Sequence, residues 1–442
     1  MDTSSRRYHS VPVRTVNGIY RVLDSAGLAK VDLDEQNLRD TARRKTRLDR
    51  FGDDSFLSAL RRLLRAIEGE AQLNPFGRIY ARKTILASLK NRLWANVWFE
   101  NHPEIRGRKL ASPIVIVGPH RSGTTRLQRM LAADPRLAYL RTWEGFNPAP
   151  RVGHPDLGRR MRRLEVQGTL ALVPHLYPGV FAGHPMGADW PEEEMLLLNH
   201  SFCSFFALGA YNIPSFYHWF LDCDKTAAYG YMADLMKLIA WARGDAADKR
   251  WVLKNPQHML DLDVLVRTFP DAKLVFIHRD PRKTVASVMS LMWHYAVQHT
   301  DAPCREAVRD IWMDFCEQAG RRCISAREHL PAAQQLDVYY EDMNRDWRSV
   351  VRRIYEFAGI EFTAEAEAAF AGALARTESE RTRRGEHRYA LEDFGTTAAE
   401  VDARMMFFRE RYAIPYEGTG TAAAGSRAST SGPEHPATPA AP

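Results

Sequence analysis

A short segment rich in glycine and hydroxyl groups, GPHRSGTT at residues 118–125, is the first candidate for chemistry in this sequence. It follows the apolar run PIVIV and precedes a stretch of helical character, so we interpret it as the turn between a buried strand and a helix. Backbone N–H groups in such a turn, together with the positive end of the helix, bind phosphate-like anions, and an arginine adds charge-assisted hydrogen bonds. The segment therefore predicts an anion-binding loop made of Gly118, His120, Arg121, Ser122, Gly123, Thr124 and Thr125.

The two glycines of this loop match the start of the nucleotide-phosphate signature G-x-x-x-x-G-K-[ST], but Thr124 occupies the position of the lysine. No apolar strand ending in a magnesium-binding aspartate stands out elsewhere in the chain. An ATP-dependent P-loop kinase is therefore an alternative hypothesis. A glycine turn that joins strand to helix without binding any ligand is another.

Apolar runs and helical stretches alternate through the middle of the chain, a pattern typical of α/β folds. Five runs have the length and composition of buried parallel strands: PIVIV (113–117), LAYLR (137–141), WVL (251–253), KLVFIH (273–278) and LDVYY (336–340). Right-handed crossovers through the intervening helices would place them in one sheet. We therefore expect an α/β fold that is P-loop-like, with three α/β/α layers around a central parallel sheet.

The two ends of the chain differ in composition from this middle part. Residues 1–110 contain apolar positions at helical spacing, for example in DDSFLSALRRLLRAIEGEA, and predict a helical N-terminal region packed on a catalytic domain at 111–416. Residues 417–442 are nearly all Gly, Ala, Ser, Thr and Pro. Such a segment buries too little apolar surface to offset chain entropy, so we expect a disordered tail.

Ligands of open parallel sheets bind beyond the carboxyl ends of the strands. Residues that directly follow the expected strands are therefore site candidates independently of any motif. Glu144 follows the second strand, Lys254 the third and Arg279 the fourth. Together with the glycine loop, they predict a crevice that holds two cations, one carboxylate and an anion-binding turn.

At this point the chain resembles the sulfotransferases that use 3'-phosphoadenosine 5'-phosphosulfate (PAPS). GPHRSGTT resembles the family's 5'-phosphosulfate loop, and FPDAKLVFIHRDPRKTVASV resembles its 3'-phosphate segment, in which Arg279 ends a strand and Ser287 lies on the next helix. The likeness runs from about Gly52, through FENHPEI and HRYALEDFG, to about Tyr416. It implies an enzyme that transfers a sulfuryl group from PAPS to a hydroxyl, with two separate anion sites for the two ends of the donor.

The resemblance also suggests roles for other residues. Lys254 matches the family lysine that contacts the oxygen bridging phosphate and sulfate, although a lysine paired with a nearby acid is the alternative. Arg383, Arg384 and Gly385 are similar to an element that closes over the 3'-phosphate, although a solvated basic loop is an equally good interpretation. A scaffold that binds the nucleotide without catalysis would carry the same binding residues.

Transfer to a hydroxyl requires a base within hydrogen-bond reach of the acceptor. Glu144 is the first candidate, because some relatives carry a glutamate base near this place. His184 is the second, because other members use a histidine. Three glutamates at 192–194 follow Pro191, an order typical of a helix start rather than of a catalytic site.

The acceptor is less well defined by the sequence. The aromatic-rich residues 201–221 would line an apolar acceptor pocket or form an ordinary buried helix pair. The arginine group RRMRRL at 159–164 fits a solvated helix face better than a contact with anionic lipid. We expect a hydrophobic small-molecule or lipid acceptor, without identifying it.

The bulk composition narrows the choice of partners and compartment. A formal net charge of +7, from 61 basic and 54 acidic residues, favours an anionic ligand but gives little support for nucleic acid. Five scattered cysteines, the absence of an apolar run of about 18 residues, and an N-terminus without a signal peptide lead us to expect a cytoplasmic protein with no transmembrane segment. We expect no metal, because Arg121, Lys254 and Arg279 can neutralise the leaving group.

Overall fold

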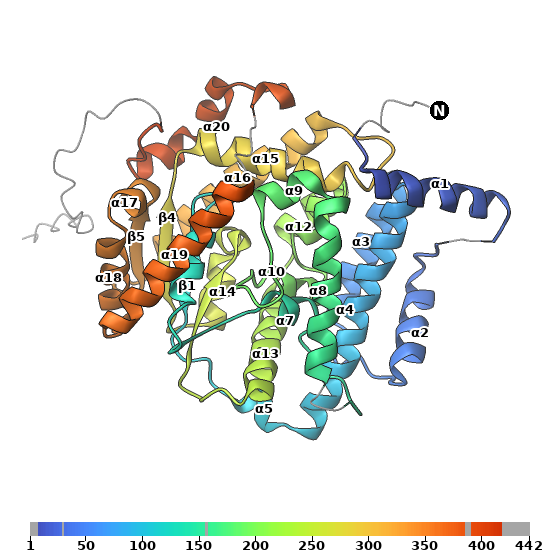
Figure 1. Cartoon of the computed structure of the whole chain (residues 1–442), viewed down its shortest axis with the longest axis horizontal. Helices are drawn as coiled ribbons and strands as arrows, with labels where there is room; N and C mark the ends of the chain where they lie inside the picture. Colours follow the sequence, from blue (N-terminus) through green and yellow to red (C-terminus); the bar gives the residue numbers. More distant parts are fainter. Residues whose placement is uncertain (1–7, 29–30, 155–157, 385–389, 418–442) are drawn as a thin grey trace, which may run out of the picture.

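The computed structural model describes residues 8–28, 31–154, 158–384 and 390–417, and its centre is a five-stranded parallel sheet (Figure 1). The strands have the order β2-β3-β1-β4-β5. Each lies where the apolar pattern predicted it, and their bounds are β1 Ile114–Val117, β2 Leu137–Tyr139, β3 Arg250–Lys254, β4 Lys273–His278 and β5 Gln335–Tyr339. The expected α/β fold with a central parallel sheet is confirmed.

Both faces of the sheet are buried, which explains why its strands are apolar without alternation. All four residues of β1 are buried, and alternate residues join different cores. Ile114 and Ile116 pack into the smaller core, whereas Val115 and Val117 pack into the larger one. Because β1 lies at the centre of the sheet between β3 and β4, the loop that follows it is held from both sides.

Two groups of helices form the outer layers. The smaller core is closed by α6 (Thr124–Leu131), α18 (Trp347–Ala358) and α19 (Ala364–Arg384). The larger core is closed by helices α13 (Thr226–Arg243), α14 (Leu262–Thr268), α15 (Pro281–Ala296), α16 (Arg305–Arg327) and α20 (Ala398–Arg411).

The described residues between 8 and 110 are mostly helical. They form α1 (Val11–Ser25), α2 (Glu35–Thr46), α3 (Phe56–Glu70), α4 (Pro75–Asn101) and α5 (Glu104–Gly107). Apolar side chains of α2, α3 and α4 belong to the larger core, so this region packs directly on the sheet domain. Of the tail expected at 417–442, Glu417 is described, and residues 418–442 lie outside the described part.

The long connection between β2 and β3 contains the remaining elements near the site. They are α7 (Thr142–Phe146), α8 (Arg159–Leu176), α9 (Pro178–Gly183), α10 (Met195–Leu198), α11 (Phe206–Ala210) and α12 (Pro214–Asp222). After β5, the short helix α17 (Tyr340–Arg345) begins at once. The aromatic-rich residues 201–221 thus form mainly α11 and α12, whose apolar side chains are mostly buried in the larger core.

Two glycines of the loop after β1 have physical reasons to be glycine. A Cβ on Gly118 would lie 2.9 Å from the carbonyl oxygen of Ile277 in the neighbouring strand. Gly123 has a φ of +91°, and a Cβ there would lie 2.8 Å from the ring of Tyr340. The loop is therefore compressed between β4 and the start of α17, with its backbone turned left-handed just before α6 begins.

Replacing Gly123 with alanine should lower the free energy of unfolding by about 1–2 kcal/mol, because alanine disfavours positive φ and Tyr340 must move. Gly230 is the matched control: it is exposed in the middle of α13 with open space around it, so Gly230→Ala should raise the stability by about 0.5–1 kcal/mol. Urea denaturation of both variants measures the difference. If both substitutions changed the free energy of unfolding in the same direction, the strain expected for alanine at position 123 would be contradicted.

Candidate active site

The loop after β1 is tied to the residues predicted to hold a second anion. Arg121 has a positive φ of 65°, and its carbonyl oxygen accepts a 2.6 Å hydrogen bond from Arg279 Nη1. Its Nε donates to the hydroxyl of Ser287 at 3.1 Å. Ser287 lies on α15 and is only 2% exposed. The fold thus joins Arg121 to Arg279 and Ser287, which lie 158 and 166 residues further along the chain, in one hydrogen-bonded group.

Arg279 holds a carboxylate in the way that arginine holds phosphate. Its Nε and Nη2 donate to the two carboxylate oxygens of Glu417 at 2.6 and 3.0 Å. The guanidinium also lies 3.9 Å from the ring centroid of Tyr340, and the backbone N–H of Glu417 is held by Asp280 at 2.8 Å. Two parallel bonds to two oxygens are the geometry that arginine offers to phosphate as well. The Glu417 carboxylate therefore stands where a tetrahedral anion fits.

Lys254 ends β3 at the same edge of the sheet and is almost completely buried, with 1% exposure. Its ammonium forms an ion pair with the Glu193 carboxylate. Its backbone N–H donates to Glu194 at 2.8 Å. A buried lysine requires a partner of opposite charge. The sequence singled out Lys254, but it gave Glu193 no role beyond a helix start.

The pattern predicted a helix start at Pro191 with the acids in its first turn, but the short helix α10 begins only at Met195, and the acids at 192–194 point into the protein. Glu192 lies 3.6 Å from the imidazole of His184. Burial opposes ionisation of Glu192, but the hydrogen bond and charge of His184 and the charge of Lys254 hold its pKa at about 2. For Glu194, which is fully buried, desolvation raises the pKa well above the usual carboxyl value. The three neighbouring carboxyl groups therefore differ strongly in their ease of ionisation.

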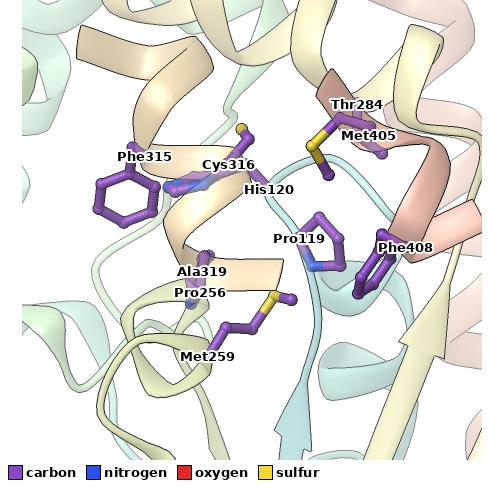
Figure 2. A pocket seen from close by; sticks show the side chains of 10 residues that line it. All are labelled: Pro119, His120, Pro256, Met259, Thr284, Phe315, Cys316, Ala319, Met405 and Phe408. Carbon is purple, nitrogen blue, oxygen red and sulfur yellow. The ribbon is translucent and has the colours of Figure 1, made fainter. Parts of the chain in front are cut away.

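His120 of the loop is buried against aromatic rings instead of pointing to solvent. Its ring centroid lies 5.0 Å from that of Phe205 and 5.4 Å from that of Trp312. Burial, and then the charges of Lys254 and Arg121, lower the pKa of His120 to about 3, so the imidazole is neutral at physiological pH. Its Nε2 has no hydrogen-bond partner among the described residues. Figure 2 shows His120 and Pro119 at an apolar pocket that is also lined by Met259 and Phe315.

Glu144, the first candidate for the base, is engaged elsewhere. It is 2% exposed, and its Oε1 accepts a 2.8 Å hydrogen bond from Arg243 Nε while its Oε2 accepts from the backbone N–H of Arg141 at 3.1 Å. Arg243 also donates to the carbonyl of Tyr139 at 2.8 Å. Both carboxylate oxygens thus fix α7 to the ends of β2 and α13. This geometry favours a structural role for Glu144 over the role of a base.

The remaining predicted residues give less information. Ser122 and Thr124 are buried in the loop, with 0% and 4% exposure, and Thr125 is half-buried in the first turn of α6. The backbone of Arg383 and Arg384 forms the end of α19, and Gly385 lies outside the described residues. Within the described ranges, no group of three or more His, Cys, Asp or Glu side chains is placed to hold a metal ion. In the same ranges, every helix is too short or too polar to span a bilayer.

Comparison with known proteins identifies the kind of protein that has this arrangement. The family described as the sulfotransferase family matches residues 113–364. The omega-hydroxy-beta-dihydromenaquinone-9 sulfotransferases of Mycobacterium tuberculosis and Mycobacterium bovis are each 25% identical over 282 residues, which are 61% of this chain and 68% of those proteins.

Solved structures agree with the sequence comparison. A sulfotransferase of Mycobacterium tuberculosis H37Rv superposes with a TM-score of 0.73 and 30% identity, covering 84% of this chain and 98% of that one. A sulfotransferase of Mycobacterium avium has a TM-score of 0.77 at 24% identity, covering 88% and 98%, and shows the same fold.

The depressed pKa of Glu192 predicts a pH-dependent contribution to stability. The pKa of this carboxyl group is 4.5 in the unfolded chain and about 2 in the folded protein. Its ionised form therefore adds fully to the free energy of unfolding above pH 4.5, and this contribution is lost as the pH falls towards 2. Glu192→Gln should therefore destabilise the protein at pH 7, and the difference from wild type should shrink by about 2 kcal/mol at pH 3. Urea denaturation at both pH values measures it.

Glu328→Gln is the control for this measurement, because Glu328 is exposed and its replacement should leave the pH dependence unchanged. A constant difference between wild type and Glu192→Gln across the two pH values would rule out the ionised, buried state of Glu192.

Proposed function

Because the chain belongs to the sulfotransferase family, we propose that it transfers a sulfuryl group from PAPS to a hydroxyl of a hydrophobic, lipid-like acceptor. One observation carries the proposal. Arg121 joins the glycine loop to the Arg279–Ser287 pair by hydrogen bonds, and a buried lysine paired with a carboxylate ends the strand next to β1.

The donor needs two separated anion sites, because it has a phosphosulfate at one end and a ribose phosphate at the other. The backbone of residues 118–125 and the start of α6 suit the phosphosulfate. Arg279 and Ser287 suit the 3'-phosphate, and the bidentate contact of Arg279 with Glu417 supports this assignment. His120 is neutral, and its Nε2 has no hydrogen-bond partner among the described residues. It can therefore form a hydrogen bond with a polar atom of PAPS bound at the loop.

Glu417 has to leave Arg279 before a 3'-phosphate can take its place. Two negative groups cannot share one guanidinium without strong repulsion. Donor affinity is therefore the net result of exchanging one anion for another. The carboxylate keeps Arg279 in its binding orientation until the donor arrives.

The ion pair between Lys254 and Glu193 suits the chemical step. When bound, the donor supplies the sulfuryl group, whose bond to the bridging oxygen breaks as the bond to the acceptor oxygen forms. The Lys254 ammonium stabilises the negative charge left behind, and the Glu193 carboxylate accepts the proton of the acceptor hydroxyl. Glu193 takes precedence over Glu144 because Glu193 is paired directly with Lys254, whereas both oxygens of Glu144 are bound by arginines.

Aromatic side chains beside the acids support a hydrophobic acceptor. Burial, and then the charges of Tyr80, Glu192 and Glu193, raise the pKa of Tyr295 well above its usual value, so the ring lies within electrostatic range of the two acids. The Tyr177 ring lies 5.6 Å from that of Tyr295. The names of the mycobacterial relatives specify an omega-hydroxylated dihydromenaquinone, a molecule that combines an apolar body with a hydroxyl.

Binding of 3',5'-diphosphoadenosine, measured by titration calorimetry, tests the donor site. Arg279→Ala should weaken binding at least tenfold, because it removes the bidentate contact. Glu417→Gln should strengthen binding severalfold, because it removes the competing charge. Glu410→Gln is the control: it removes the charge of an exposed carboxylate on nearby α20 and should leave the affinity for diphosphoadenosine unchanged. Tighter binding of ATP with magnesium than of diphosphoadenosine would instead favour a kinase.

Single-turnover transfer from labelled PAPS to a polyprenol tests the base. Glu193→Gln should slow transfer by about 100-fold or more while keeping diphosphoadenosine affinity within about threefold, because it removes only the proton acceptor. Glu144→Gln should slow transfer by no more than about threefold. The reverse ranking would return the base role to Glu144, and full activity in both variants would leave His184 as the candidate.

A further inference from the structure

Large apolar side chains are exposed on only two segments of the described surface. Four lie in or just after α1 and four lie in or just before α8, and they are Val11, Ile19, Val22, Leu28, Val152, Met161, Leu164 and Leu172. Scattered apolar atoms are normal on protein surfaces, but gathered large side chains indicate an interaction site. The two helices contact each other, and Figure 1 shows α1 beside the upper end of α8.

α1 packs on the protein through Val13, which is fully buried, but it leaves other large apolar side chains exposed. Val11, Ile19 and Val22 are 65%, 54% and 67% exposed. The side packed against the protein carries Asn17, which is 1% exposed and accepts a 2.8 Å hydrogen bond from the backbone of Phe76. Globular proteins usually bury the apolar side of an amphipathic helix. Val13 and polar contacts therefore fix α1 to the protein, while Val11, Ile19 and Val22 remain exposed.

A further ion pair reinforces this orientation. Arg21 Nη2 lies 2.8 Å from the carboxylate of Asp301, and it lies on the same side of α1 as Asn17. Just before the helix, the backbone N–H of Ser10 donates to the Gln298 side chain at 2.9 Å. Gln298 and Asp301 both lie just after α15. The exposed apolar side chains of α1 thus face outward as a consequence of specific contacts.

α8 combines an exposed apolar stripe with positive charge. Met161, Leu164 and Leu172 lie along one side of the helix and are 42%, 51% and 55% exposed. Of its four arginines, Arg162 is buried and Arg163 pairs with Asp189, whereas Arg159 and Arg160 are exposed. The single glutamate of the helix, Glu165, is paired with Arg151. Apolar side chains bordered by arginines are suited to the boundary between lipid tails and anionic headgroups.

We propose that α1 and α8 form a docking face for the surface of an anionic lipid bilayer. The exposed apolar side chains of the two helices enter the headgroup region, and the exposed Arg159 and Arg160 of α8 bind lipid phosphates. The inference deepens the proposed function and rests on it for its purpose, because a lipid-like acceptor resides in such a bilayer.

The docking face adjoins the acceptor side of the proposed site. α8 ends at Leu176, and the next residue, Tyr177, contacts Tyr295 beside the glutamates. α9 then connects directly to His184. On the other side, Tyr8, which precedes α1, packs edge-to-face on Trp293 of α15 at 5.3 Å between ring centroids. The protein therefore meets the bilayer with the side that carries the proposed base.

Vesicle flotation of the full chain tests the docking face. Wild type should float with phosphatidylcholine vesicles that contain about 30% phosphatidylglycerol, and at least fivefold less with pure phosphatidylcholine. The double variants Ile19→Glu/Val22→Glu and Leu164→Glu/Leu172→Glu should each reduce binding to the anionic vesicles at least tenfold. Ala364→Glu/Ala368→Glu, which adds the same charge at exposed positions of α19, should bind like wild type.

Three outcomes would overturn the inference: no flotation of wild type, equal flotation of wild type and both double variants, or equal binding to neutral and anionic vesicles. A concentration-dependent dimer in light scattering that both double variants abolish, without vesicle binding, would assign the face to a second copy of the chain. All variants should unfold near the wild-type temperature and bind diphosphoadenosine with wild-type affinity. If the wild type did not bind diphosphoadenosine, the proposed donor would be refuted. The vesicle experiment would still show whether α1 and α8 bind an anionic bilayer.

Discussion

The structure depends on one electrostatic constraint: cations that are to bind anionic ligands are largely buried at the edge of the sheet and must be neutralised before any ligand arrives. An unpaired buried charge costs several kcal/mol, more than a marginally stable fold can tolerate. Three cations at this edge of the sheet have an internal carboxylate. Glu417 neutralises Arg279, Glu193 neutralises Lys254, and Glu144 neutralises Arg243. These pairs look alike in a static structure, but only those next to the glycine loop are placed for exchange with a ligand.

The sequence predicted the parts of this arrangement that depend on local pattern. All five strands lie where apolar runs indicated, because a strand buried on both faces cannot be polar. Arg279 and Lys254 followed from the rule that ligands bind beyond strand ends. The local sequence pattern does not predict the direction in which a side chain points after its strand ends. Glu144 also follows a strand, but it turns towards Arg243, which is 99 residues away in sequence.

The partners of the site cations were missed for a related reason. Glu193 belongs to a run of acids that satisfies the rules for a helix start, and only the packing of its segment against β3 brings it to Lys254. Glu417 lies 138 residues from Arg279, at the end of the described chain. The apolar residues of α1 are equally visible in the sequence, but periodicity alone cannot tell which side of a helix faces the protein. The contacts of Asn17 and Arg21 decide that question.

The arrangement of the two sites also separates two substrates of opposite character. Figure 1 places β5 and α17, and with them Tyr340 beside Arg279, at one side of the molecule and α1 at the other. The donor is highly charged and comes from water, whereas a lipid-like acceptor comes from a bilayer. With α1 and α8 on the membrane, the side at which Glu417 must leave Arg279 remains in water. In the same view α10, which begins two residues after Glu193, lies between these two sides, so the proposed docking would leave the proposed donor site open to water.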